Sequence, residues 1–355
     1  MTNKLKEAKE SLDKIIKKSR VHLYKPIQIA EILHHHRIYK NIELDQLETY
    51  RNKSKLWRDT ICNRFVGRSS TSSQKYQDDV FNETAMPPRL LKILGEENSI
   101  KGGIVEAYIY RQFALRFTQM NIGLDYCKNN DENSFELDKF LALFWNEPGL
   151  KRSIDKVYEI IVYSLFSSLV DALDISVQVS LNPSKGDLLK EFEDFTEKVI
   201  QLNSANPSIK IPAKIFRVGV TNAADRGLDM WANFGLAIQI KHLSLTEELT
   251  ENIVSSVMAD RIVIVCKELE KNLIVSLLNQ IGWKSRIQSI ITEQDLLVWY
   301  KKALTGKHST LVGKKVLSNL IDQINVEFPS TNNQDFSNFI KDRNYEILTD
   351  TYWTI

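Results

Sequence analysis

Apolar residues recur every three to four positions through the N-terminal part of the chain, which is the period of an amphipathic helix. The pattern predicts helices over residues 4–20, from Pro26 onward, over 43–51 and over 54–65. The next segment, 67–76, is polar and basic without a helical period, so we expect two short strands joined by a flexible tip. Helices followed by a basic hairpin are typical of a winged helix–turn–helix domain, whose third helix enters the major groove of DNA.

The rest of the chain divides into a helical stretch and a mixed one. Residues 87–173 are helical almost throughout, and the apolar segment 154–173 is expected to be a buried helix that packs between domains or subunits. Beyond residue 185 the pattern predicts a helix, three strands, a helix over 246–258 and a strand, followed by a further helix over 269–281. This order indicates an α/β (mixed α+β) domain with a mixed central sheet. We therefore expect three parts: a winged-helix-like recognition domain at 1–95, a helical middle at 96–180 and a sheet domain at 181–355.

The first helix of the sheet domain is expected over residues 186–202. One face of this helix is apolar and should be buried against the core. That face carries Leu188, Leu189, Phe192, Phe195, Val199 and Leu202.

Charge is distributed unevenly along the 355 residues. Residues 1–75 contain 17 Lys and Arg against 8 Asp and Glu, a net charge of +9, whereas the remaining 280 residues contain 30 against 37, a net charge of −7. A basic block on an otherwise acidic chain is the footprint expected of a nucleic-acid-binding module, although a solubilising tail would look the same. Three widely spaced cysteines and the lack of an apolar N-terminal segment fit a cytoplasmic protein.

The basic residues of helix 54–65 and of the hairpin after it are the candidates for contact with DNA. Arg and Asn can form paired hydrogen bonds with base edges, whereas Lys contacts go mostly to phosphates. A solvated basic face is the alternative. The candidates are Lys53, Lys55, Arg58, Asn63, Arg64, Arg68, Ser70 and Lys75.

A polar triplet in the sheet domain carries the clearest chemistry. Two predicted strands meet at residues 233–235, and a three-residue hairpin loop with Gly235 in the left-handed conformation fits that spacing. In this register Asp229 faces Gln239, and Lys241, two residues further on, points to the same face of the sheet. The three side chains should therefore converge on one patch.

This patch suits the hydrolysis of a phosphodiester bond. Carboxylate and amide oxygens of Asp229 and Gln239 are suitable ligands for Mg²⁺, a hard cation. A bound metal polarises the phosphate and promotes formation of a hydroxide nucleophile. Lys241 can orient the attacking water and stabilise the negative charge that develops on the phosphate.

The triplet and the order of predicted elements resemble the PD-(D/E)XK nuclease superfamily. Asp229 matches the metal-binding aspartate and Lys241 the lysine of its motif, whereas Gln239 stands where most members have an acidic residue and Leu228 where they have proline. The wider string KIFRVGVTNAADRGLDMWANFGLAIQIKHLSL is similar to the HaeII family of type II restriction endonucleases. The segments SRVHLYKPIQIAEILHHHR and GRSSTSSQKYQDDVF resemble the N-terminal part of the same family, so the resemblance covers most of the chain.

The resemblance implies a Mg²⁺-dependent enzyme that cuts both strands of DNA at a short palindromic GC-rich site, with RGCGCY as the family expectation. A palindromic target implies a two-fold homodimer, and the family implies a cognate DNA methyltransferase in the same cell. The superfamily often draws a further acidic residue from the helix before the first core strand, and Glu191 is our candidate. Two alternatives remain: a repair or methylation-dependent nuclease on the same core, and a DNA-binding regulator whose nuclease-like domain is inactive.

Overall fold

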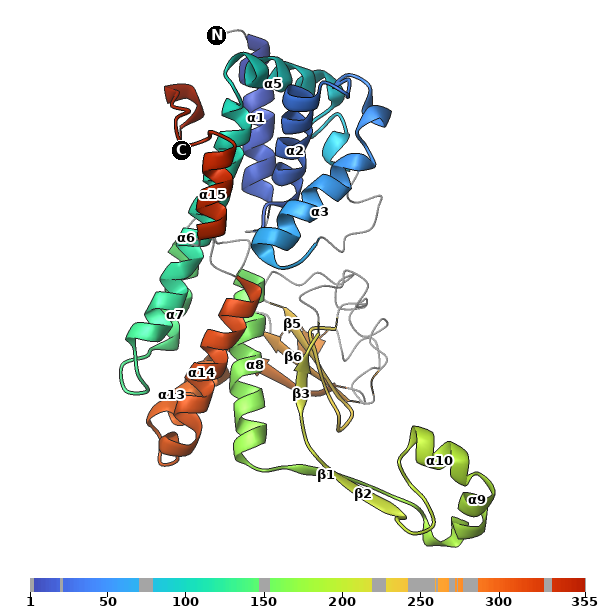
Figure 1. Ribbon diagram of the computed structural model, residues 1–355. Helices are drawn as coiled ribbons and strands as arrows, with labels where there is room; N and C mark the ends of the chain where they lie inside the picture. The colour runs from blue at the N-terminus through green and yellow to red at the C-terminus, as the bar shows by residue number, and fades with distance from the viewer. Residues whose placement is uncertain are drawn as a thin grey trace. The chain divides into compact units, whose positions relative to one another are not determined.

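The computed structural model describes residues 3–19, 22–69, 79–146, 154–218, 228–241, 261–267, 287–328 and 334–354, with isolated residues at 259, 272 and 274–276. The chain forms two compact units (Figure 1). The first contains residues 1–160, 219–225 and 320–355, and the second contains residues 161–218 and 226–319. Each unit is described by itself below.

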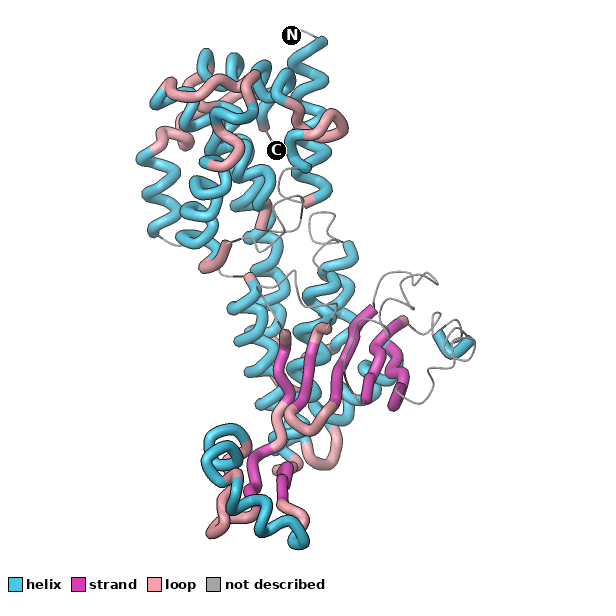
Figure 2. Tube along the Cα trace, turned by 90° about the vertical axis from the view of Figure 1, so that its right-hand side faces the viewer, coloured by secondary structure: helices cyan, strands magenta, loops and turns pink. Residues whose placement is uncertain are grey.

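The second unit is built on a five-stranded sheet (Figure 2). The antiparallel pairs β3–β4 and β4–β5 and the parallel pairs β5–β6 and β6–β7 make the sheet mixed, which confirms the predicted fold class. β6 is buried along nearly its whole length, and this explains its uninterrupted apolar sequence. The strands are β3 (Ile215–Arg217), β4 (Met230–Ala232), β5 (Leu236–Lys241), β6 (Arg261–Cys266) and β7 (Ile287–Thr292).

Helices precede and follow this sheet along the chain. α8 (Ile154–Ala172) comes before it. Its apolar residues up to Leu165 are buried, as the sequence predicts, but those in its last two turns are only partly buried. α13 (Glu293–Thr305) follows β7 directly and begins with a capping box, in which Thr292 and Asp295 satisfy each other's backbone N–H groups. α14 (Ser309–Glu327) comes next. The helices predicted over 246–258 and 269–281 lie largely outside the described residues.

Residues 176–212, which we call the arm, leave the sheet as a hairpin of β1 (Ser176–Ser180) and β2 (Ser208–Pro212). Between the two strands lie a short 3₁₀ turn, η4 (Pro183–Lys185), and two short helices, α9 (Gly186–Glu191) and α10 (Glu193–Val199), at the end of the hairpin away from the five-stranded sheet (Figures 1 and 2). The predicted single helix over 186–202 is therefore wrong, because the chain breaks at Phe192.

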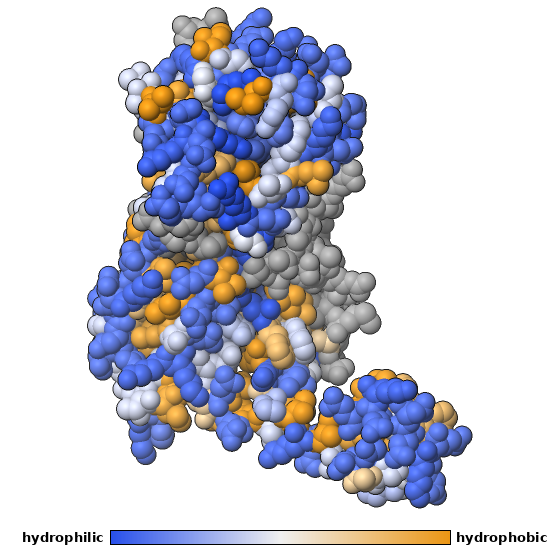
Figure 3. All heavy atoms as spheres, viewed as in Figure 1, coloured by the Kyte–Doolittle hydropathy of each residue, from blue (hydrophilic) through white to orange (hydrophobic). Residues whose placement is uncertain are grey.

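The apolar face predicted for this helix is also not buried as a whole. Leu189 and Leu202 are buried, but Leu188, Phe192, Phe195 and Val199 are exposed, and apolar atoms show among the polar surface of the arm in Figure 3. Helical spacing identifies which side chains share a face. It does not determine whether the same chain provides a surface to cover that face.

The first unit is helical in all its described parts. α1 (Asn3–Lys18) buries Leu5, Leu12 and Ile16 on one face, as its spacing predicts. The break predicted at residues 102–103 is confirmed, since both glycines have positive φ angles of 63° and 107°. The other elements are α2 (Tyr24–Tyr39), η1 (Leu47–Thr49), α3 (Lys53–Val66), η2 (Asp79–Phe81), α5 (Pro88–Ile100), α6 (Ile104–Asn129), α7 (Leu137–Asn146), α15 (Gln334–Asp342) and η6 (Thr351–Trp353).

Two features of this unit differ from the sequence-based expectation. The helix predicted over 43–51 is only the single turn η1, because the Thr49 hydroxyl donates to the carbonyls of Glu43 and Gln46 and competes with helical hydrogen bonding. The C-terminal residues 334–354, which the sequence assigns to the sheet domain, belong to this unit. There Phe336 and Phe339 of α15 pack edge-on against Phe65 of α3.

The winged helix–turn–helix remains a prediction. Residues 40–52 separate α2 from α3, which is longer than the usual three- to four-residue turn of that motif. Most of the expected wing lies outside the described residues. Among the helices that the structure describes, none is both long and apolar enough to cross a membrane.

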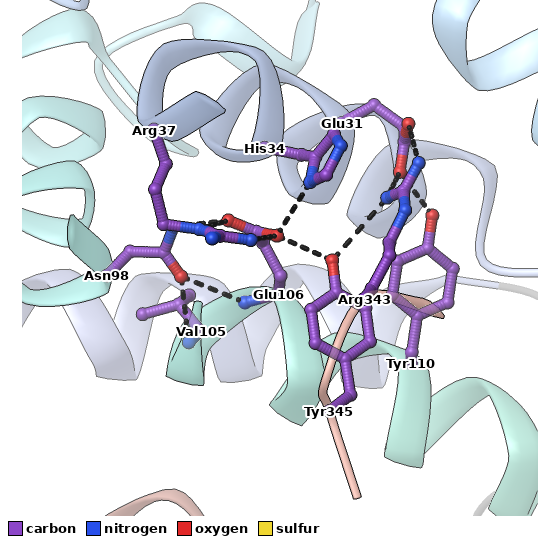
Figure 4. Close-up of polar contacts among 9 residues, drawn as sticks. All are labelled: Glu31, His34, Arg37, Asn98, Val105, Glu106, Tyr110, Arg343 and Tyr345. Carbon is purple, nitrogen blue, oxygen red and sulfur yellow. Dashed lines mark hydrogen bonds and ion pairs between the residues drawn. The ribbon is translucent and has the colours of Figure 1, made fainter. Parts of the chain in front are cut away.

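Two buried carboxylates hold the helices of the first unit together (Figure 4). Glu106 of α6 accepts hydrogen bonds from Nε and Nη2 of Arg37, each at 2.9 Å, and also from His34 and Tyr345. Glu31 of α2 is paired with Arg343, with N–O distances of 2.6 and 3.0 Å. These bonds tie α2 to α6 and to the C-terminal segment.

The environment of Glu106 predicts how the first unit responds to acid. Burial alone would raise the pKa of this carboxyl, but the hydrogen bonds from Arg37, His34 and Tyr345 outweigh burial and lower the pKa from 4.5 to about 2. A group whose pKa is lowered on folding stabilises the protein above its unfolded pKa, and this contribution is lost as the pH falls from about 4.5 toward 2.

We therefore expect Glu106→Gln to lower the free energy of unfolding at neutral pH by about 3 kcal/mol, because it breaks a buried ion pair. The variant should also lose less stability than wild type between pH 4.5 and 2. Urea unfolding at a series of pH values measures both effects, with the exposed Glu96→Gln as control. An equal loss of stability on acidification in wild type and Glu106→Gln would contradict this assignment.

Candidate active site

The candidate site is built on the hairpin of β4 and β5. Ala232 pairs with Leu236 and Met230 with Ile238, which confirms the register predicted from the sequence. The turn between the strands contains Gly235 with a φ of 82°, the left-handed conformation that favours glycine. This register places residue 229 directly across from residue 239.

Asp229 is held by backbone groups of both neighbouring strands. Its carbonyl accepts from the N–H of Val218, 2.8 Å away. Its side-chain Oδ2 accepts from the N–H of Ile240 in β5, 2.7 Å away. A carboxylate fixed by a backbone donor is oriented before any ligand arrives, which is the property expected of a catalytic group.

Gln239 is fully buried on β5. Within the part of the chain that the structure describes, neither its Oε1 nor its Nε2 has a hydrogen-bond partner. A buried amide without partners costs about 1–3 kcal/mol, so such groups are rare and meet an ordered water, a ligand or a reacting group. The unpartnered amide next to the fixed Asp229 carboxylate is the most informative feature of the site.

The other two catalytic candidates are placed differently. Lys241 ends β5, where its backbone is paired with Cys266, and its side chain is outside the described set. Glu191 does not come to this site. It is exposed at the end of α9, which lies between the two strands of the separate β1–β2 sheet, at the end away from the five-stranded sheet (Figure 1).

The residues present fit a magnesium ion. Mg²⁺ is usually bound by one or two protein carboxylates and keeps several water molecules or substrate phosphate oxygens. Asp229 and Gln239 would supply one carboxylate and one amide oxygen, and DNA would supply the phosphate. Among the described residues, no cluster of three His, Cys, Asp or Glu side chains is suited to hold a metal.

An aromatic pair that the sequence did not single out lies beside the site. Phe216 and Trp231 are cross-strand partners whose rings stack with centroids 4.4 Å apart, and both are exposed. Trp231 is two residues from Asp229, so both should point to the same face of the sheet. Alternation of side chains along the strand would have placed Trp231 on the same face as Asp229 from the sequence alone.

The structure corrects two of the DNA-contact candidates. Arg58 is buried and donates to Asp59 and Gln28. Arg68 is buried and donates to the side chain and carbonyl of Glu327 at 2.9 and 2.8 Å. Both guanidinium groups therefore stabilise the fold, because an arginine surrounded by protein needs carboxylate and carbonyl partners there.

The remaining DNA-contact candidates fall into three groups. Lys53 and Asn63 are exposed on α3, and Lys55 is half-buried. Arg64 is exposed but forms an ion pair with Asp335 of α15. The other two candidates, Ser70 and Lys75, lie outside the described residues.

We expect Arg58→Ala to reduce the free energy of unfolding by about 1–3 kcal/mol, because it leaves the buried Gln28 oxygen without this donor. DNA affinity per folded molecule should stay close to that of wild type. Lys53→Ala, at an exposed position on the same helix, should leave stability unchanged and serves as the matched control. Denaturant unfolding and a DNA-binding titration measure the two effects. Weaker DNA binding by Arg58→Ala without any loss of stability would show that Arg58 contributes to DNA contact.

Known proteins match this chain over nearly its whole length. The chain matches the HaeII restriction endonuclease family over residues 8–345. It is 65% identical over 348 residues to the type II restriction enzyme HaeII of Haemophilus aegyptius. This match covers 98% of this chain and 99% of the relative. It is 58% identical to the type II restriction enzyme NgoBI of Neisseria gonorrhoeae, with the same coverage. No solved structure matches the chain. On the extent of these matches, the chain belongs to the HaeII restriction endonuclease family.

Proposed function

We propose that this type II restriction endonuclease cuts DNA with an active site of the PD-(D/E)XK type, formed by Asp229, Gln239 and Lys241 with Mg²⁺ as cofactor. The single observation that carries the proposal is the buried, unpartnered amide of Gln239 beside the backbone-anchored carboxylate of Asp229. The names of the two relatives support DNA as the substrate.

Each residue of the triplet has a defined task in this proposal. The N–H of Ile240 holds one Asp229 oxygen in place, so the carboxylate is already oriented toward the site. The Gln239 oxygen supplies a neutral second ligand. Bound Mg²⁺ would polarise the scissile phosphate and favour deprotonation of the attacking water. The Lys241 ammonium would position that water and stabilise negative charge on the phosphate.

The proposal extends to the target and the assembly. We propose a short palindromic GC-rich site, with RGCGCY as the family expectation, cut on both strands by a homodimer with one active site per strand. A DNA methyltransferase of the same specificity would protect the host DNA. Recognition is assigned to the exposed polar residues of α3, Lys53 and Asn63, and to the segment that contains Ser70 and Lys75.

Asp229→Ala and Lys241→Ala should each reduce cleavage by at least about 100-fold, the loss typical of removing a group that stabilises transition-state charge. Sequence-specific DNA binding should be retained, because neither residue belongs to the proposed recognition surface. Plasmid digestion with Mg²⁺ and a binding assay in EDTA measure the two properties. Cleavage within tenfold of wild type would remove that residue from the mechanism.

The same digestion separates this function from its alternatives when unmethylated and methylated plasmids are compared. Discrete fragments from unmethylated DNA alone support a restriction endonuclease. Cleavage of methylated DNA alone would indicate a methylation-dependent or repair nuclease, and binding without cleavage an inactive regulator. Sequencing the fragment ends identifies the recognition site and tests RGCGCY directly.

Gln239→Met tests whether the buried amide is kept for function. Methionine has a similar shape and no hydrogen-bonding requirement, so this change should leave the free energy of unfolding unchanged or raise it by about 1–2 kcal/mol. Cleavage should fall at the same time. Denaturant unfolding and plasmid digestion measure the two effects. A strongly destabilised Gln239→Met variant would show that the amide has a structural partner, and its role as a ligand would then be withdrawn.

A further inference from the structure

The arm carries an apolar surface that its own unit leaves exposed. Four large side chains on α9, on α10 and at the residue between them are half-exposed or more: Leu188 at 53%, Phe192 at 50%, Phe195 at 52% and Val199 at 66%, and Ile200 follows at 37%. We call these five residues the arm face. All five lie within thirteen consecutive residues of the arm.

The arm face is held in shape by contacts beneath it. Leu189 and Leu202 are buried, and the Glu193 carboxylate accepts from the backbone N–H of Ser204, 2.7 Å away. This bond joins the start of α10 to the chain that returns toward β2. Binding at the arm face would therefore need little ordering of the arm.

We infer that the arm face binds the same face of a second copy of this chain. A two-fold axis brings identical patches together, so the apolar face of each subunit is buried against the same face of the other. The inference rests on the proposed homodimer and names the surface that forms it.

The area of the arm face is consistent with a dimer contact. At roughly half exposure, the five side chains leave on the order of 400 Å² of apolar surface in water. Two copies would then bury about 800 Å² of apolar surface, and the core of a homodimer interface is about 65% apolar. The whole contact would reach about 1,200 Å², the lower end of the range for specific, stable interfaces.

Charge argues against DNA as the occupant of this face. The arm contains 4 Lys and 5 Asp and Glu over residues 176–212, a net charge of −1. Proteins that bind DNA gain most of their affinity from neutralising phosphates with Lys and Arg. The basic excess of this chain lies instead in residues 1–75.

The structure also weakens the alternative dimer surface. The sequence favoured the apolar segment 154–173 for packing between subunits, but most of its apolar side chains are already used within the chain. Ile154, Val157, Ile160, Ile161, Val162 and Leu165 are all at most 1% exposed. An interface through this part of the helix would require the chain to open first. The arm face needs no such change, nor does the end of the segment, where Leu173 is 68% exposed.

The test compares two double variants of the full-length protein by sedimentation equilibrium, each with and without cognate DNA in EDTA. Phe192→Ser with Phe195→Ser should raise the dimer dissociation constant by roughly 100-fold or more, as expected when central aromatic contacts are removed. Val298→Ser with Leu311→Ser is the matched control, since these residues of α13 and α14 are 40% and 54% exposed outside the arm. The control should sediment as wild type. Dimerisation itself stabilises the folded state, so unfolding is compared at a protein concentration where wild type is monomeric, and there both variants should keep the wild-type thermal unfolding midpoint.

A cross-link gives a second measurement that does not depend on affinity. The three native cysteines are buried, so a single Val199→Cys change introduces an accessible thiol on the arm face. A short bis-maleimide should convert this variant, but not Leu311→Cys, into a covalent dimer that still binds cognate DNA.

The outcomes separate the arm face from the proposed function. If wild type is a dimer and the phenylalanine variant is equally dimeric, the arm face is not the interface, although the homodimer stands. If wild type stays monomeric alone and on DNA, both the homodimer and this inference fail. A phenylalanine variant that is dimeric but binds DNA more weakly would identify DNA as the occupant. One that, as a monomer, unfolds at a lower temperature than the wild-type monomer would identify another segment of this chain. Either result would overturn the inference.

Discussion

The antiparallel register of β4 and β5 is the constraint on which the candidate active site depends. Strand side chains alternate between faces, so a slip of one residue would turn Gln239 to the other face and take the Asp229 carboxylate away from the Ile240 amide. The turn at Gly235 sets this register, and the Arg261 side chain donates to the carbonyl of Phe234 from the neighbouring strand β6. The fold thus fixes the relative position of two residues that are ten apart in sequence.

Buried charge organises the helical unit in a similar way. Glu31 and Glu106 each accept from an arginine of another segment, and Arg58 and Arg68 are buried beside acceptors of their own. Removing a charge from water is costly unless a partner and hydrogen bonds compensate. Several arginines of the basic N-terminal block are therefore committed to the fold, and exposed lysines such as Lys53 remain the candidates for contact with DNA.

A dimer interface on the arm would determine how the two proposed active sites are arranged. A palindromic target presents two equivalent phosphates related by a two-fold axis, and an enzyme that cuts both needs its active sites related by the same axis. An interface made of residues 188–200 would lie in the same unit as the hairpin that carries Asp229. The face that sequence periodicity assigned to the core would then be buried between subunits, which satisfies the same hydrophobic requirement.

The sequence by itself determined the local features of this protein. Helical spacing located α1, α3 and the buried α8, paired glycines located the break after α5, and the turn at 233–235 set the register that places Asp229 opposite Gln239. These features follow from contacts between residues close in the chain.

Only the tertiary structure decided which polar and apolar groups are available. It buried Arg58 and Arg68, carried Glu191 away on the arm, placed residues 334–354 with the N-terminal helices and left the apolar face of α9 and α10 exposed. Each of these outcomes depends on what packs against a residue from a distant part of the chain. Periodicity and net charge do not contain that information, because they describe a residue's neighbours in sequence and not its neighbours in space.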